Sequence, residues 1–330
     1  MNDIDTLTTY GDKPEILYHY TDIRGLLGIL ETNSIWATNI FYLNDAAEYE
    51  YPVELMNKEI EKRIEECEKC LGDLPIPDRG VMDITKEQTQ KRKKEKEKKY
   101  FYKVLKSIIK DIKHYHIYIC SFSKNNDQLS QWRGYCPNGN GFSIGFKTLD
   151  LEKQMNKHGF KLVKCVYDKD DQKRILKDEL DKWSFSRIQS DIKKYKRSQK
   201  LEKLEGLGGL NSNDRASLLA ILDAAGSMIN NIPKIKHPSF IEEIEWRFYY
   251  HFNVENINKI KFREGRSMIV PYYDIPLKDE TAEIKISDIK VGPTPHPELS
   301  MRSVEELLKS KGYKRDGYKI DVSTVTYRTF

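Results

Sequence analysis

The sequence has few cysteines and no long apolar run, and both absences exclude classes of protein. Five cysteines are spread over 330 residues, an odd number at a low density that does not fit a disulfide-stapled secreted domain. No stretch of about 18 apolar residues occurs, so no membrane-spanning helix and no membrane partner is expected. The polar first residues lack the apolar core of a secretory signal. Together these absences predict a cytoplasmic protein.

Two nucleotide-binding signatures are also missing. Neither G-x-G-x-x-G, which opens a dinucleotide-binding helix, nor the G-x-x-x-x-G-K-[ST] phosphate loop occurs, so a Rossmann or P-loop enzyme is disfavoured. Metal signatures are weak. Cys67-x-x-Cys70 has no second pair, and His114 and His116 share a strand face without spaced acidic partners. No metal site is therefore expected.

Charge is abundant but unevenly distributed. Charged residues make up 32% of the chain and hydrophobic residues 38%, a balance that suits a globular protein with long, solvated helices. The net charge is +5, and residues 86–99 alone hold eight Lys or Arg against three Glu, which is also +5 (8 − 3). The rest of the chain is then neutral (5 − 5 = 0). We expect a solvated helix face at 86–99, with a phosphate-contacting arm as the alternative.

The hydrophobic pattern predicts clustered strands separated by two helical blocks. Strands are expected over residues 16–20, 34–39, 114–123, 142–147, 160–168, 241–252, 259–265, 267–275, 282–293 and 319–328. A charged helical hairpin is predicted over 54–113, and a second helical block over 170–235. Because strands and helices do not alternate regularly, the pattern favours an α+β fold. The prediction is a single domain, 1–330, with two helical insertions.

Residues 17–50, LYHYTDIRGLLGILETNSIWATNIFYLNDAAEYE, place a histidine, His19, at the end of a predicted strand. Thr21 is the expected N-cap of the helix that follows. Apolar residues recur at i, i+3, i+4 and i+7 from Ile23, at positions 23, 26, 27 and 30, which is one face of a short helix. Asn33 is its expected end. A side chain at such a junction can point into a cavity while its backbone stays anchored.

Three short motifs on predicted strands could carry chemistry. They are YHYT at 18–21, SFS at 121–123 with a Trp-Arg pair shortly after it, and EIEWR at 243–247. In the third motif, the strand period of two predicts that Glu243 and Glu245 lie on one face. Two carboxylates on one face repel each other. A purely structural strand would therefore need cations opposite them.

In this order, the motifs resemble those of the ADP-ribosyltransferase superfamily, where a His or Arg ends the first strand, a Ser-Thr-Ser-like stretch lies mid-chain and a late strand carries Glu-x-Glu. His-x-Thr before a Leu-rich helix is most similar to the DNA-modifying toxin and RNA phosphotransferase branches. More of the chain resembles a bacterial domain family of unknown activity, through LYHYT…NDAAEYE, SFS…WRGY…GFSIGF, EIEWR and IKVGP…TYR. The resemblance implies an ADP-ribosyltransferase-like split β-sheet core.

The resemblance also implies an NAD site and assigns roles to its residues. Glu245 would stabilise the oxocarbenium-like state of nicotinamide–ribose cleavage, and Glu243 would orient the acceptor. His19, with Thr21 beside it, would hydrogen-bond a ribose hydroxyl. Ser121 and Ser123 would form the floor of the pocket. An aromatic residue, Tyr20, Tyr42 or Trp132, would stack on the nicotinamide, and Arg133 or Arg24 would bind the pyrophosphate.

The implied function is NAD-dependent ADP-ribosyl transfer of the toxin or phage-defence type, to a nucleic acid or protein acceptor, with an antitoxin or defence-system protein as a further partner. With water as the acceptor the chain would be an NAD glycohydrolase. The alternative is a transferase-like module without turnover, which senses a nucleotide or a partner through its helical insertions. The third motif distinguishes them, because an enzyme needs Glu245 free whereas a sensor tolerates it in a salt bridge.

Each candidate residue also has a structural alternative. His19 and Trp132 could belong to the hydrophobic core. The carboxylates of Glu243 and Glu245 could pair with Arg247, Lys259 or Lys261 across a sheet. Asn44-Asp45 with Glu48 could be no more than a helix cap.

Overall fold

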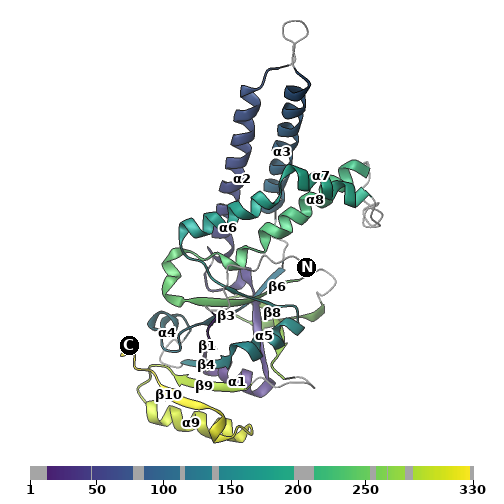
Figure 1. Cartoon of the computed structure of the whole chain (residues 1–330). Helices are drawn as coiled ribbons and strands as arrows, with labels where there is room; N and C mark the ends of the chain where they lie inside the picture. The colour runs from purple at the N-terminus through teal and green to yellow at the C-terminus, as the bar shows by residue number, and fades with distance from the viewer. Residues whose placement is uncertain are drawn as a thin grey trace. The chain divides into compact units, whose positions relative to one another are not determined.

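A computed structural model of the chain describes residues 13–45, 47–76, 85–111, 116–135, 141–196, 212–252, 258–265, 267–278 and 285–327. The chain divides into two compact units (Figure 1). The sheet unit comprises Met1–Glu48, Tyr115–Tyr167 and Lys236–Phe330, and the helical unit comprises Tyr49–His114 and Asp168–Ile235. The predicted helical ranges 54–113 and 170–235 lie inside the helical unit.

The sheet unit is built on a mixed sheet that has ten strands among the described residues. The strands are β1 (Ile16–Asp22), β2 (Ser34–Asn39), β3 (His116–Ser123), β4 (Gly141–Lys147), β5 (Lys161–Lys164), β6 (Glu245–Phe252), β7 (Ile260–Glu264), β8 (Ile269–Pro276), β9 (Ile286–Val291) and β10 (Lys319–Val322). They run in the order β10-β9-β4-β1-β3-β2-β8-β7, with β6 paired to β3 and β5 paired to β6. Only β9 and β10 pair in parallel among the described strands.

Short helices complete the sheet unit. They are α1 (Ile23–Thr32), α4 (Leu129–Tyr135), α5 (Thr148–Lys157) and α9 (Pro297–Ser310), with single 3₁₀ turns η1 (Ile40–Tyr42), η6 (Pro238–Glu243) and η8 (Arg315–Gly317). All ten predicted strands have a counterpart in the structure, although several are shorter than expected. The α+β class is therefore confirmed.

One edge of β3 is shared by two branches of the sheet. Its other edge pairs with β6 along the whole strand. The shared edge pairs with β2 at Tyr118 and Ile119 and with β1 only at Ser123. Residues 120–122 therefore have no strand partner on that edge among the described residues. The sheet splits at this point, and backbone groups of β3 become available to side chains.

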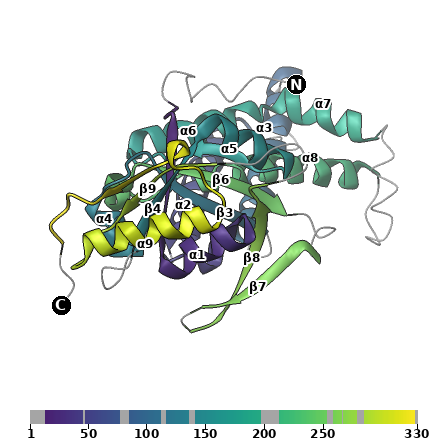
Figure 2. The same cartoon turned by 90° about the horizontal axis from the view of Figure 1, so that it is seen from below.

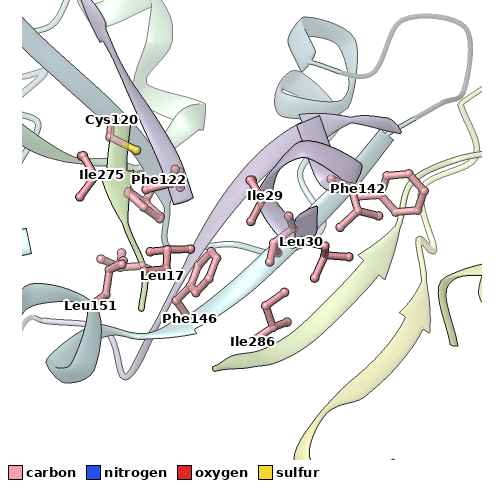
Figure 3. Close-up of a cluster of buried hydrophobic side chains, with 14 of the residues drawn as sticks. Leu17, Ile29, Leu30, Cys120, Phe122, Phe142, Phe146, Leu151, Ile275 and Ile286 are labelled. Atoms are coloured by element: carbon pink, nitrogen blue, oxygen red, sulfur yellow. The ribbon is translucent and has the colours of Figure 1, made fainter. Parts of the chain in front are cut away.

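The hydrophobic core packs on one face of the sheet. Leu17 of β1, Phe122 of β3 and Phe146 of β4 are buried together with Leu151 of α5 and Ile275 of β8, as Figure 3 shows. Burying an apolar side chain of this size contributes about 1.5–3 kcal/mol relative to leaving it exposed. The core therefore ties the first, middle and last segments of the sheet unit together.

The start of α1 differs from the sequence prediction. Asp22, not Thr21, is the N-cap, because Thr21 still belongs to β1 and the Asp22 Oδ1 accepts a hydrogen bond from the Gly25 N–H at 2.8 Å. A Cβ at Gly25 would lie 1.8 Å from the Thr21 Oγ1, so only glycine allows this close approach. The predicted end at Asn33 is confirmed, since its φ of 48° is the left-handed conformation that asparagine tolerates.

The buried face of α1 is also rotated from the predicted one. Leu26, Ile29 and Leu30 are buried, whereas Ile23 and Leu27 are each 43% exposed. The apolar period of the sequence locates this helix correctly but overestimates how much of it the core covers.

The helical unit is built of long, charged helices. They are α2 (Ala47–Asp73), α3 (Lys86–Lys110), α6 (Lys169–Lys182), α7 (Phe185–Lys196) and α8 (Ser212–Ile229), followed by the turn η5 (Ile232–Lys234). Helices α2 and α3 lie side by side (Figure 1), joined by ion pairs from Lys99 to Glu68 at 2.8 Å and from Lys106 to Glu61 at 2.7 Å. The basic segment 86–99 thus lies on α3, and some of the lysines of this helix pair with acidic side chains of α2. None of the described helices combines the length and apolar character needed to cross a membrane.

Candidate functional site

A small cavity in the sheet unit lies where β1 leaves β3. Its volume is about 30 Å³. It is lined by residues of all three sequence motifs and of α4: Tyr18, His19 and Tyr20; Ser121 and Phe122; Glu243 and Glu245; and Gln131 and Tyr135. Segments that are far apart in the sequence therefore meet at the split of the sheet.

His19 occupies the split itself. Its Nδ1 lies 3.0 Å from the Ser121 carbonyl oxygen, in the part of β3 that has no strand partner on this edge. Because a carbonyl can only accept, Nδ1 donates the proton and Nε2 is the acceptor nitrogen. Burial lowers the pKa of His19, although the bond to Ser121 opposes that shift. The imidazole is therefore neutral at neutral pH and offers an acceptor.

Glu243 and Glu245 do not share a strand. Glu245 begins β6, but Glu243 ends η6, and Ile244 between them has a left-handed φ of 43°. The predicted same-face arrangement on a strand is therefore wrong. A β-branched residue in this conformation costs about 1–3 kcal/mol. The turn nevertheless brings both carboxylates to one cation, the ammonium of Lys236.

The two glutamates belong to a buried ionic network. Lys236 Nζ donates to the Glu245 Oε2 at 2.5 Å and to Glu243, and it lies 3.2 Å from the Glu48 Oε1. Arg247 donates to Glu245 through Nε at 2.7 Å and Nη2 at 2.8 Å, and also to Glu48. Only the Glu243 side chain keeps appreciable exposure, at 17%. With all groups ionised, three carboxylates and two cations sum to −1 (2 − 3).

The environments of the two glutamates shift their pKa values in opposite directions. Burial raises the pKa of Glu243, and the attraction of Lys236 only partly opposes this. Burial on its own would also raise the pKa of Glu245, but the charges of Arg247 and Lys236 outweigh burial and lower the pKa of that carboxyl. Glu245 is therefore a fixed anion, and Glu243 is the carboxyl better placed to exchange a proton. Such separated pairs are typical of acid–base sites.

Sequence reasoning missed the parts that Lys236 and Glu48 play in this network. Asp45 caps α2, because its Oδ1 accepts a hydrogen bond from the Ala47 N–H at 2.9 Å. The Glu48 carboxylate is thereby left to pair with Arg247 and Lys236. The two buried carboxylates, Glu48 and Glu245, require nearby cations, and that requirement is the signal that could have pointed to a lysine.

Tyr20 and Trp132 pack against each other, with ring centroids 4.7 Å apart at 68°. Trp132 is fully buried and does not line the cavity. Tyr20 does line it, but its hydroxyl donates to the Asn125 carbonyl at 2.8 Å and accepts from the Gln128 N–H at 3.0 Å. These two aromatic side chains therefore serve mainly to hold the loop before α4.

The C-terminal residues fasten α4. Asp127 accepts hydrogen bonds from the Trp132 Nε1 at 2.8 Å, the Ser323 Oγ at 2.5 Å and the Thr324 N–H at 2.8 Å. Burial would raise the pKa of Asp127, but these hydrogen bonds lower it, so the acceptor is charged. Val325 packs against Trp132 in the same cluster. Residues 323–325 thus hold α4, which forms one wall of the cavity, in place.

The other predicted site residues lie outside the cavity lining. Ser123 is buried, and its Oγ donates to the Glu243 carbonyl oxygen at 2.8 Å, which holds the end of η6. Tyr42 is 38% exposed on η1. Arg133 is exposed, with its guanidinium 5.6 Å from the Tyr327 ring centroid. Two further residues, Thr21 of β1 and the exposed Arg24 of α1, are likewise absent from the lining.

The histidines and cysteines that the sequence offers as possible metal ligands are His114 and His116, and Cys67 and Cys70. His114 lies outside the described residues, and His116 begins β3. Cys67 is buried in α2, where burial and the nearby Glu95 raise the pKa of its thiol. No group of three or more possible metal ligands occurs among the described residues.

Residues 141–145, GFSIG, match the G-x-S-x-G pattern of a serine nucleophile elbow. That pattern carries chemistry only on a sharp turn between a strand and a helix. Here all five residues lie within β4, and Ser143 is fully buried. The match is therefore coincidental.

Comparison with known proteins bears on the segment that carries much of the site. The sequence matches no curated protein and no solved structure. A link to ADP-ribosyltransferases therefore stays a prediction. Residues 131–248, which contain most of α4 as well as Lys236, Glu243, Glu245 and Arg247, match a domain family described as "Protein of unknown function (DUF2971)".

Proposed function

We propose that the sheet unit is an NAD-dependent ADP-ribosyltransferase of the toxin or phage-defence type, acting on a nucleic acid or protein acceptor. One observation carries the proposal. A neutral histidine, a serine and two glutamates with opposite pKa shifts come from three distant segments and line one cavity. The position of that cavity, where β1 and β2 part along β3, is consistent with the split sheet that the resemblance implies.

In this proposal His19 and Glu243 do the main work. The Nε2 of His19 accepts a hydrogen bond from a ribose hydroxyl, with the Ser121 side chain beside it. The bond between ribose C1′ and nicotinamide breaks, and its electron pair leaves with nicotinamide. The acceptor forms a new bond to C1′ and gives its proton to Glu243, whose raised pKa suits a base.

Glu245 takes a different part from the one that the resemblance implies. Its two carboxylate oxygens are already occupied by Arg247 and Lys236, so little of its charge is available to an oxocarbenium-like state. Because Lys236 binds both glutamates, Glu245 acts through that lysine and positions Glu243.

The size of the cavity sets a condition on the proposal. A water molecule needs roughly 10–15 Å³ measured in the same way, so a cavity of about 30 Å³ has room for a few waters at most and for no nucleotide. Binding of NAD therefore requires a lining element to move, and α4, which contributes Gln131 and Tyr135, is the wall that is held by the C-terminal residues.

A second candidate is a transferase-like sensor without turnover. The observation that favours it is the complete pairing of Glu245, which the sequence argument associates with a sensor. In that case NAD or another nucleotide binds at the split and is not cleaved. An NAD glycohydrolase is the variant of the first candidate in which water replaces the acceptor.

Consumption of NAD by the purified chain, in the presence of a nucleic acid or a protein as the acceptor, tests the proposal. Glu243→Gln should lower the rate by about 10²–10⁴-fold, because the base is lost while size and hydrogen bonding are kept. Glu242→Gln is the matched control, since Glu242 is the adjacent residue and is exposed. A wild-type chain whose melting temperature rises with NAD but which leaves NAD intact is a sensor. A chain that neither consumes NAD nor is stabilised by it contradicts both candidates.

A further inference from the structure

The β7–β8 hairpin, taken together with the residues that flank its strands, has a net positive charge in the sequence. Residues 259–278 hold five Lys or Arg and two acidic residues, which is +3 (5 − 2). Figure 2 shows the two strands extending together as a ribbon. Lys261 lies on this ribbon with a side chain that is 58% exposed, although it pairs with Asp274 at 2.7 Å. Residue 266 lies outside the described residues, and the described part of this range holds four Lys or Arg against two acidic residues, which is +2 (4 − 2).

A pair of aromatic rings lies beside this charge, with Trp36 exposed and Tyr272 half-buried. Trp36 of β2 is 40% exposed, whereas the other tryptophans of the chain are at most 4% exposed. Its ring centroid is 4.6 Å from that of Tyr272, with the planes at 41°. The guanidinium carbon of Arg263 lies 5.6 Å from the Trp36 ring centroid, as in a cation–π contact. Three planar groups thus gather at one place on the hairpin and its neighbouring strand.

The strand register places this pair of rings on the face of the sheet that carries Ser121, which is one residue of the cavity lining. Trp36 and Thr38 are two residues apart in β2 and therefore share a face. Thr38 is opposite Tyr272 in β8 and opposite Ile119 in β3. Ile119 and Ser121 are again two residues apart. Ser121, which lines the cavity, therefore belongs to the face that carries the pair of rings.

The chemistry of this surface selects its ligand. Exposed aromatic rings stack on flat groups, and a neighbouring guanidinium and ammonium attract phosphates. A single-stranded nucleic acid offers both unpaired bases and phosphates. A proline-rich peptide also docks on Trp and Tyr side chains, but the +3 charge of residues 259–278 adds nothing specific to that contact.

We infer that the surface formed by Trp36, Tyr272, Arg263 and Lys261, called here the stacking surface, binds single-stranded nucleic acid. Bases stack on Trp36 and Tyr272, and the backbone phosphates meet Arg263 and Lys261. That the bound strand is the acceptor of ADP-ribose rests on the proposed function, whereas binding itself does not.

Binding of a fluorescein-labelled oligothymidylate, followed by anisotropy, tests the inference. Loss of one stacking ring should weaken binding about tenfold for Trp36→Ala, whereas Trp36→Phe should retain most of the affinity. Arg263→Gln should weaken binding and reduce the slope of log Kd against log salt by about 1. Phe262→Ala is the matched control, because Phe262 is 66% exposed and is the strand neighbour of Arg263, so its side chain points to the opposite face.

Intrinsic fluorescence gives an independent measurement. Because the other tryptophans are buried, unlabelled oligothymidylate should quench the emission of Trp36 alone, and Trp36→Phe should abolish the quenching. Equal affinities for Trp36→Ala and Phe262→Ala would overturn the inference, as would binding of a proline-rich peptide in place of the oligonucleotide. Oligonucleotide binding without NAD consumption refutes the proposed enzyme but leaves the stacking surface in place. NAD consumption without oligonucleotide binding supports the proposed enzyme but refutes the stacking surface as a nucleic-acid site.

Discussion

The basic segment of α3 and the ionic network at the start of β6 are both dense in charge, yet they differ in burial and therefore in energetic importance. In α3, Lys99 pairs with Glu68 while the two side chains stay 28% and 49% exposed. In the network, Arg247 and Glu245 pair at 0% and 4% exposure. Exposed pairs contribute about 0–1 kcal/mol, whereas breaking a buried pair costs about 3–5 kcal/mol. Charge density in a sequence therefore indicates little until burial is known.

Arg247→Met should produce the largest loss of stability. The substitution leaves three carboxylates, those of Glu48, Glu243 and Glu245, with Lys236 as their remaining cation in the network. We expect the free energy of unfolding to fall by about 3–5 kcal/mol, measured by urea denaturation. The double substitution Arg247→Met with Glu245→Met removes the pair together, so part of the loss should return. A double variant that is less stable than the single variant would show that the pair is not the source of the cost.

Acid should affect the two glutamates in opposite ways. The pKa of Glu245 is lowered in the folded chain, so its contribution to stability is present above its ordinary pKa of 4.5 and is lost as the pH falls below that value. The pKa of Glu243 is raised from 4.5, so its ionisation costs stability as the pH rises through its folded value.

Melting temperatures measured between about pH 3 and pH 8 separate the effects of the two glutamates on stability. Glu245→Gln should lower the melting temperature at neutral pH and flatten its fall in acid. Glu243→Gln should leave the melting temperature at neutral pH unchanged or higher, although it removes the proposed base. A variant that gains stability while losing activity is typical of a functional site. Similar destabilisation by both substitutions would assign Glu243 to a purely structural role.

Lys99→Ala should have the smallest effect. The pair with Glu68 is exposed, so we expect less than about 1 kcal/mol of destabilisation, and less still at high salt. Urea denaturation at two salt concentrations measures this. A loss comparable to that of Arg247→Met would mean that the exposed and buried networks are not energetically distinct.

Local patterns in the sequence predict the strands, because period-two alternation depends on neighbouring residues, whereas the meeting of the three motifs was implied by the resemblance alone. The geometry of Glu243 and Glu245 was not predictable in this way, since Ile244 leaves the strand conformation that the pattern assumes. The hydrogen-bonding roles of Ser123 and Trp132 were also not predictable from the sequence. Both side chains satisfy partners, the Glu243 carbonyl and Asp127, that only the tertiary structure brings close.

Lys236 shows the limit most clearly. It is nine residues from Glu245 and much farther along the chain from Glu48, yet it contacts both. No periodicity connects these positions. The resemblance therefore implies that the three motifs meet at one site, but nothing in the sequence indicates which charges there neutralise one another.

The hydrogen bonds of Asp127 to Ser323 and Thr324 join residues 196 and 197 positions apart. During synthesis, α4 emerges from the ribosome long before the residues that fasten it. A nascent chain can form β1, β3 and β4 while this wall of the cavity is still unsecured. The candidate site can therefore reach its final form only after residues 323–324 have left the ribosome, and a prematurely terminated chain that lacks them would leave α4 without these hydrogen bonds.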